Sequence, residues 1–187
     1  MKILIVEDRK DKQTDIKKVI FSKYKQKIKV DTASNYFSAK KKVFAEKNFL
    51  MLIVDMFLPD AKDDDELKGL AGKDLIFDMY SEGISIPTLV MTQYTDYDNN
   101  SLLERDEKRL QKGFLINPHY GTELPDKVNE AFDPTNFVGL HEYLSSEIPF
   151  YLGIIYYSNQ YKEWEVNLLN LIDRLLRDGS YENITTG

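Results

Sequence analysis

Carboxylate and hydroxyl side chains follow three short apolar runs of this sequence. Glu7 and Asp8 come directly after KILIV, Asp55 follows LMLIV, and Thr92 follows IPTLVM. Carboxylates gathered in a partly desolvated cleft repel one another and raise at least one pKa unless a cation lies among them. Mg²⁺ takes oxygen ligands together with phosphate oxygens, and an aspartate beside it can attack a phosphoryl group. These residue types therefore favour phosphoryl transfer to Asp55, with the Thr92 hydroxyl hydrogen-bonded to the product.

The apolar runs alternate with helical patterns along the first two thirds of the chain. We expect strands at 2–6, 28–31, 49–54, 86–92 and 113–116, and helices at 11–24, 36–44, 75–80, 93–111 and 124–132. Such alternation predicts an α/β fold with a doubly wound, five-stranded parallel sheet and right-handed crossovers. Ligands bind outside the carboxyl ends of the strands in such sheets. The residues expected at that edge are Glu7, Asp8, Asp55, Thr92 and Asn117.

Three segments in order, ILIVED, LIVDMFLPD and VMT, resemble the receiver domains of two-component response regulators over residues 1–133. The resemblance implies a CheY-like, flavodoxin-like fold. It also implies that Asp55 takes a phosphoryl group from a histidine kinase or a phosphotransfer protein, and that a downstream protein recognises the result.

The same resemblance implies roles for the residues around Asp55. Asp8, Asp55 and the backbone carbonyl of Phe57 would bind Mg²⁺, and Glu7 would assist through water. Thr92 would turn toward the phosphoryl group, and the aromatic ring of Phe114 would change rotamer with the switch.

The sequence departs from the receiver pattern at two positions and in one loop. Asn117 precedes Pro118 where the family has a lysine, and it cannot supply the charge-assisted contact of an ammonium group. Lys73 and Lys112 are candidate substitutes. Gln93 stands where the family has a small residue. The loop at 60–72 is long and acidic, and it either shields the site or is simply solvated.

Residues 134–187 are expected to form a mainly helical extension. Helical spacing predicts helices at 137–144 and 161–178, while FYLGIIYY at 150–157 suits either a buried strand or a helix. This much apolar surface must be buried against the receiver, a second copy of the chain or another protein. Basic residues are sparse here, so a DNA-binding output is disfavoured.

Composition narrows the function classes. The 187 residues are 42% hydrophobic and 30% charged, without an apolar run long enough to span a bilayer or a secretory leader, so we expect a cytoplasmic protein. The absence of cysteine excludes disulfides and thiolate metal sites. A net charge of -6 argues against a broad nucleic-acid surface.

Three hypotheses remain. The first is a phosphorylated, non-enzymatic signalling receiver that acts through protein contacts, with the extension as output or dimerisation surface. The second is a pseudo-receiver, suggested by Asn117, that works without phosphorylation. The third is a phosphatase-like enzyme with Asp55 as nucleophile, which is ranked last because position 57 is Phe57 and not an aspartate that could act as acid or base.

Overall fold

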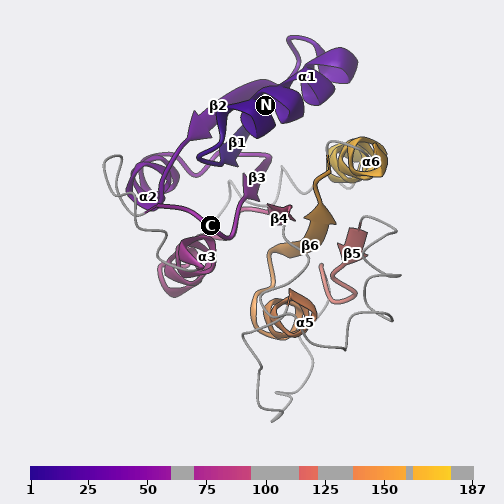
Figure 1. Cartoon of the computed structure of the whole chain (residues 1–187). Coiled ribbons are helices and arrows are strands. Elements are labelled where there is room, and N and C mark those ends of the chain that lie inside the picture. The colour runs from indigo at the N-terminus through magenta and orange to yellow at the C-terminus, as the bar shows by residue number, and fades with distance from the viewer. Residues whose placement is uncertain (60–69, 94–113, 122–136, 159–161, 178–187) are drawn as a thin grey trace.

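The computed structural model describes residues 1–59, 70–93, 114–121, 137–158 and 162–177. Within them lies one six-stranded sheet in the order β2-β1-β3-β4-β6-β5 (Figure 1). Its strands are β1 (Lys2–Val6), β2 (Lys29–Ala33), β3 (Met51–Val54), β4 (Thr88–Thr92), β5 (Phe114–Ile116) and β6 (Tyr151–Tyr156). Neighbouring strands are parallel except for β5, which pairs antiparallel with β6. The structure therefore has a doubly wound sheet with an added edge strand.

Helices cover both faces of this sheet. They are α1 (Lys10–Tyr24), α2 (Tyr36–Ala45), α3 (Ala71–Ser81), α5 (Phe137–Glu147) and α6 (Glu163–Arg177). Figure 1 shows α1 and α6 on one side, with α2, α3 and α5 on the other. A separate cluster of buried apolar side chains fills each side. Strands covered on both faces must be apolar throughout, which explains the uninterrupted apolar runs in β1, β3 and β4.

The first four strands and first three helices lie close to where the sequence predicts them. Helix α1 buries Ile16, Val19 and Ile20 on one face, as its spacing indicates. Asn35 caps α2, because its side chain accepts a hydrogen bond from the Ser38 amide at 2.7 Å.

The position predicted for the fifth strand is corrected by the structure. Residues 114–116 do form a strand, but it lies antiparallel at the sheet edge, and β6 takes the place beside β4. β6 is twice as long as β5 and almost entirely buried, so it suits the position between two neighbours. Gly153 in β6 has φ 140°, and a Cβ there would lie 2.1 Å from the Leu115 carbonyl oxygen. Glycine at this position lets β5 approach β6.

The mainly helical extension expected over 134–187 is also corrected. Its central segment is β6, a strand inside the main sheet, and the expected boundary at 133/134 runs between strands of one sheet. The apolar stripe of α6 faces the same cluster as α1, so it is buried within the chain rather than offered to a second copy. Tyr24 of α1 ties the two helices together, since its hydroxyl donates to Asp173 Oδ1 at 2.8 Å and lies 3.0 Å from the Leu169 carbonyl oxygen.

Several expectations fall outside the described residues. These are the helix at 93–111 apart from Gln93, the helix at 124–132, residues 60–69 of the acidic loop at 60–72, and Lys112. Among the helices of the described ranges, none has the length and apolar character required to cross a membrane.

Candidate functional site

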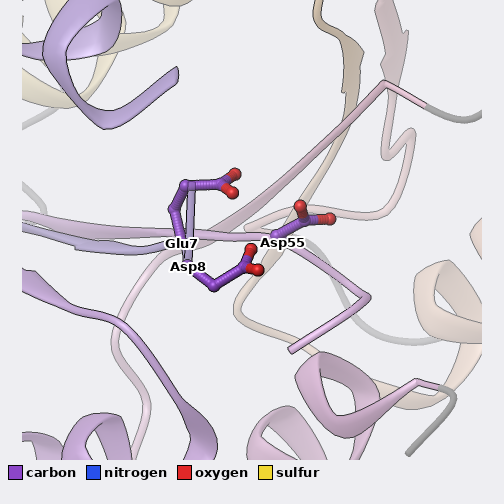
Figure 2. A group of neighbouring side chains, drawn as sticks. All are labelled: Glu7, Asp8 and Asp55. Atoms are coloured by element: carbon purple, nitrogen blue, oxygen red, sulfur yellow. The ribbon is translucent and has the colours of Figure 1, made fainter. Parts of the chain in front are cut away.

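Three carboxylates meet where β1 and β3 end. β1 and β3 pair in parallel with Val6 opposite Val54, so the residues that follow them emerge at the same edge. The Asp55 amide donates a hydrogen bond to the Val6 carbonyl oxygen at 2.9 Å, which holds the two strand ends in register. Glu7, Asp8 and Asp55 each contribute a carboxylate oxygen to a group whose members lie within 4.8 Å of one another (Figure 2). The expected acidic cluster is therefore present.

The three carboxylates differ in their surroundings. Glu7 and Asp55 are buried, with 1% and 5% of their surfaces exposed, while Asp8 is accessible. Burial raises the pKa of Glu7, and the negative charge of Asp55 adds to the rise, whereas the Lys12 ammonium opposes it. The Arg9 amide donates a hydrogen bond to Glu7 Oε1 at 3.0 Å.

Lys12, in the first turn of α1, supplies a buried cation to this group. Its side chain is 1% exposed, and its Nζ lies 2.6 Å from Glu7 Oε2 and 3.1 Å from Asp55 Oδ2. Nζ also donates a hydrogen bond to the Met91 carbonyl oxygen at 2.8 Å. The contact with Glu7 is an ion pair without hydrogen-bond geometry, and Oε2 has no hydrogen-bond partner in the described structure. Lys12 thus joins the carboxyl ends of β1, β3 and β4.

Lys12 is not among the predicted site residues, because a lysine in the first turn of a lysine-rich helix normally faces water. One feature of the sequence pointed to it. Lys12 precedes Ile16, Val19 and Ile20 by four, seven and eight residues, so it lies on the apolar face of α1. A lysine on that face, beside a strand end with carboxylates, must place its charge among them.

Thr92 and Gln93 complete this edge of the sheet. Thr92 is the last residue of β4, is 1% exposed, and its carbonyl oxygen accepts a hydrogen bond from the Tyr157 amide at 2.7 Å. The Gln93 side-chain oxygen accepts a hydrogen bond from the Arg9 guanidinium. The Gln93 side chain, which stands where the family has a small residue, is therefore bound to Arg9.

Asn117 lies at the other end of the sheet. Its side-chain amide donates to the carbonyl oxygen of Tyr151, the first residue of β6, at 2.7 Å. Tyr151 pairs with Thr88, where β4 begins, whereas the acidic cluster lies where the parallel strands end. The expectation that Asn117 stands beside Asp55 is therefore wrong, because β5 runs antiparallel to the other strands. Asn117 is a buried structural residue whose Oδ1 also accepts from the His119 amide at 2.8 Å.

Three other predicted residues, Phe114, Phe57 and Lys73, lie in different parts of the structure. Phe114 begins β5 opposite Ile155 and packs against the apolar cluster shared by α1 and α6. The Phe57 amide approaches Asp55 Oδ1 at 3.4 Å, and the role of its carbonyl as a metal ligand stays a prediction. Lys73 in α3 lies over the ring of Phe77, with Nζ 6.0 Å from the centroid.

The donor set suits a hard divalent cation. It consists of one carboxylate oxygen from each of Glu7, Asp8 and Asp55, and the accessible Asp8 provides an open side. Lys12 already offsets part of the negative charge, so a metal at this position would share Asp55 with an ammonium group.

Comparison with known proteins finds a curated protein that is similar to this chain in sequence. The Detocs response regulatory protein DtcB of Enterobacter cloacae (strain JD6301) is 30% identical over 110 residues, which are 56% of this chain and 73% of that protein. No family model matches the chain.

Solved structures include similar folds. The signal receiver domain of a putative Luxo repressor protein from Vibrio parahaemolyticus matches with a TM-score of 0.51 at 12% identity, covering 100% of this chain and 97% of its own. The Francisella response regulator 1452 receiver domain covers 95% and 97%, with a TM-score of 0.47 and 12% identity. The match to the Vibrio domain concerns the fold alone, and it extends over the residues beyond 133.

Proposed function

Because this chain belongs to the family of response-regulator receiver proteins, which act in two-component signalling, we propose that Asp55 accepts a phosphoryl group and thereby switches the protein. The donor is a histidine kinase or a phosphotransfer protein of the cytoplasm, and the output is a contact with a downstream protein. The observation that carries the proposal is the convergence of Glu7, Asp8 and Asp55 at the carboxyl ends of β1 and β3.

The chemistry follows from the position of Asp55. One of its carboxylate oxygens forms the new P–O bond while the P–N bond of a phosphohistidine donor breaks and its electron pair leaves on the imidazole nitrogen. The Thr92 hydroxyl, at the end of the neighbouring strand, is the candidate donor to the transferred group. Phe114 remains the proposed aromatic reporter of the switch, acting from the edge strand.

Asp8, Asp55 and the Phe57 carbonyl are the proposed ligands of Mg²⁺, with Glu7 assisting through water. Bound there, Mg²⁺ would neutralise charge on the oxygens of the phosphoryl group. The grouping of three carboxylates and the accessibility of Asp8 support this assignment.

The hypothesis of a phosphorylation-independent module depended on Asn117 as the replacement for the family's lysine. Because Asn117 lies at the opposite end of the sheet, its identity has no bearing on how a phosphoryl group is held at Asp55. The strand-end lysine is still missing from this chain, but Lys12 Nζ lies 3.1 Å from Asp55 Oδ2, and this cation favours phosphorylation as the function of the site.

Intact mass spectrometry tests the proposal. The full chain is incubated with Mg²⁺ and phosphoramidate, beside Asp55→Asn and the control Asp74→Asn, which alters an exposed carboxylate of α3. The wild type and the control should gain the mass of one phosphoryl group, and Asp55→Asn should not.

Two results would contradict the proposal. No Asp55-dependent adduct, even with a cognate kinase, would leave a phosphorylation-independent interaction module. Continuous release of phosphate at an enzymatic rate would instead identify a phosphatase-like protein.

A further inference from the structure

A phosphoryl group on Asp55 would bring additional negative charge into a cluster that already holds the carboxylates of Glu7 and Asp8. Phosphoryl oxygens in proteins are normally stabilised by a metal ion together with a fixed cationic side chain. The family pattern places that side chain at the end of the fifth parallel strand. In this chain that strand is β6, and the residues that follow it, Tyr157 and Ser158, carry no charge.

The cationic side chains near this edge differ in what they contact. The Arg9 guanidinium is bound to Asp11 and Gln93, and Lys73 lies over the Phe77 ring. Lys12, in contrast, reaches Asp55 Oδ2 at 3.1 Å. Within the described residues, the cation that forms an ion pair with Asp55 is the Lys12 ammonium.

Lys12 is held in place by more than its charge. The Met91 carbonyl oxygen fixes its Nζ beside the end of β4, one residue before Thr92. Its Nζ also lies 5.6 Å from the ring centroid of Tyr157, the residue that follows β6. A cation in the first turn of a helix is disfavoured by the helix dipole, so this position needs a compensating partner, and the strand-end carboxylates provide it.

We propose that Lys12, supplied by α1, is the cation that positions Asp55 and binds the phosphoryl group once it is transferred. This inference rests on the proposed function of Asp55 and assigns the role of the missing strand-end lysine to a different element. The ammonium keeps its protons throughout. As Asp55 forms the new P–O bond with protonated phosphoramidate, the donor P–N bond breaks, its electron pair stays on nitrogen, and ammonia leaves. Nζ then shifts from the carboxylate oxygen to a phosphoryl oxygen, and the Met91 contact keeps it in reach.

The test measures the rate of Asp55 phosphorylation and the lifetime of the adduct, both by intact mass, in the full chain. Lys12→Met should slow phosphorylation by phosphoramidate on the order of 10- to 100-fold, the effect of losing a charge-assisted hydrogen bond. Lys12→Arg retains a cation and should recover at least part of the rate. Lys18→Met is the matched control, because Lys18 lies on the same helix with its side chain 72% exposed, and it should behave as the wild type.

Folding is separated from chemistry by a second variant. Lys12→Met leaves two buried carboxylates without their ammonium, so thermal unfolding is recorded for every variant. Glu7→Gln combined with Lys12→Met removes one negative and one positive charge, which keeps the charge balance of the buried group. The double variant should unfold at a temperature closer to that of the wild type and yet be phosphorylated more slowly than Glu7→Gln alone, which shares its change at the metal site.

Two outcomes overturn the inference, and they are distinguishable. If the wild type forms the adduct and a folded Lys12→Met, or the folded double variant, forms it at the same rate, Lys12 is only a counter-ion and the proposed function of Asp55 stands. If the wild type forms no adduct at Asp55, with phosphoramidate or with a kinase, both proposals fail.

Discussion

Asp55 is held by groups that come from four separate parts of the chain. Lys12 approaches one carboxylate oxygen, the Phe57 amide approaches the other, and Val6 fixes the backbone amide. The fourth is Gly72 in the first turn of α3, where an added Cβ would lie 2.1 Å from the Asp55 carbonyl oxygen. The site therefore depends on the absence of a side chain at position 72 as much as on the charged residues.

Substituting Gly72 with alanine should destabilise the protein and displace Asp55. The new methyl group would overlap backbone atoms of Asp55 and Met56, which cannot rotate away, so we expect a loss of about 3 kcal/mol in the free energy of unfolding. Urea denaturation measures this loss, and phosphoramidate labelling should slow in parallel. Gly83→Ala is the control. Gly83 has φ +67°, which strains an alanine, but no atom lies within 4 Å of the added Cβ, so the free energy of unfolding should fall by only about 1 kcal/mol. Equal stability of the two variants would contradict the steric argument.

Asp8 provides a residue-scale prediction about the metal. Asp8→Asn should weaken Mg²⁺ binding by at least about 10-fold, because a charged oxygen ligand is replaced by a neutral one. Calorimetric titration with Mg²⁺ measures the dissociation constant. Asp11→Asn removes a nearby carboxylate that pairs with Arg9 and should leave Mg²⁺ affinity near the wild-type value. If both variants bind Mg²⁺ equally well, Asp8 is not a ligand.

At this scale the sequence revealed part of the site. Glu7, Asp8, Asp55 and Thr92 could be predicted together because each follows a recognisable buried strand, and the ends of parallel strands share an edge. Lys12 was not predicted as a site residue, because lysine side chains normally lie in solvent. Only its position on the apolar face of α1 indicates that it is buried.

At the scale of elements, the main difficulty is deciding which strand pairs with β4. Both 114–116 and 151–156 are apolar, and local sequence does not state which partner a strand will choose. The nearer segment was expected to be that partner, but β6 makes the longer pairing, with Thr88, Leu89, Val90, Met91 and Thr92 all matched. That choice moved Asn117 away from the site, since reversing the direction of a strand exchanges its two ends.

Asn117 tests this reversal. Asn117→Ala removes the hydrogen bonds to the Tyr151 carbonyl oxygen and from the His119 amide, and should lower the free energy of unfolding by about 1–3 kcal/mol. The rate of Asp55 phosphorylation should not change, because the site lies at the other end of β6. Asn170→Ala, at an exposed position of α6, is the control for stability. Slower labelling of a folded Asn117→Ala would place Asn117 in the site after all.

The contact between α5 and β6 makes stability depend on pH. His141 Nδ1 lies 3.0 Å from the Tyr151 hydroxyl, and burial lowers the pKa of His141 from 6.5 to about 4. The unfolded chain therefore binds the histidine proton more readily than the folded one. The resulting stability, about 3 kcal/mol, is complete above pH 6.5 and is lost as the pH falls through about 4.

His141→Gln removes this titration while retaining a side chain able to hydrogen-bond to Tyr151. Denaturant unfolding between pH 7 and pH 4 should show a smaller loss of stability in His141→Gln than in the wild type, with a difference of about 3 kcal/mol across the range. Parallel stability curves for the two proteins would show that His141 does not titrate differently in the folded state.

At the scale of the whole molecule, the sequence indicated an α/β receiver with a boundary at 133/134, and the sheet contains strands from both sides of that boundary. The sequence predicts that the β-α alternation ends near residue 133, because the short strand at 113–116 is the fifth in chain order. In the structure α5, β6 and α6 continue the alternation, and the match to the Vibrio receiver domain covers this region as well. Periodicity identified α6 and its apolar stripe, yet it could not say that the stripe faces the chain's own sheet.

Truncation tests whether the two parts fold as one unit. A chain ending at residue 133 would leave β4 without its β6 neighbour and would uncover the cluster that α6 shares with α1. α6 alone buries Trp164, Leu168, Leu171, Ile172 and Leu175. At about 1.5–3 kcal/mol for each side chain, their loss is comparable with the total stability of about 5–15 kcal/mol typical of a domain.

We therefore expect the 1–133 chain to show no cooperative thermal unfolding transition by circular dichroism and to take no phosphoryl group on Asp55. The 1–177 chain, which retains every described residue, should unfold cooperatively and be labelled. If the 1–133 chain folded and were phosphorylated, residues 134–187 would be an appendage rather than part of the receiver.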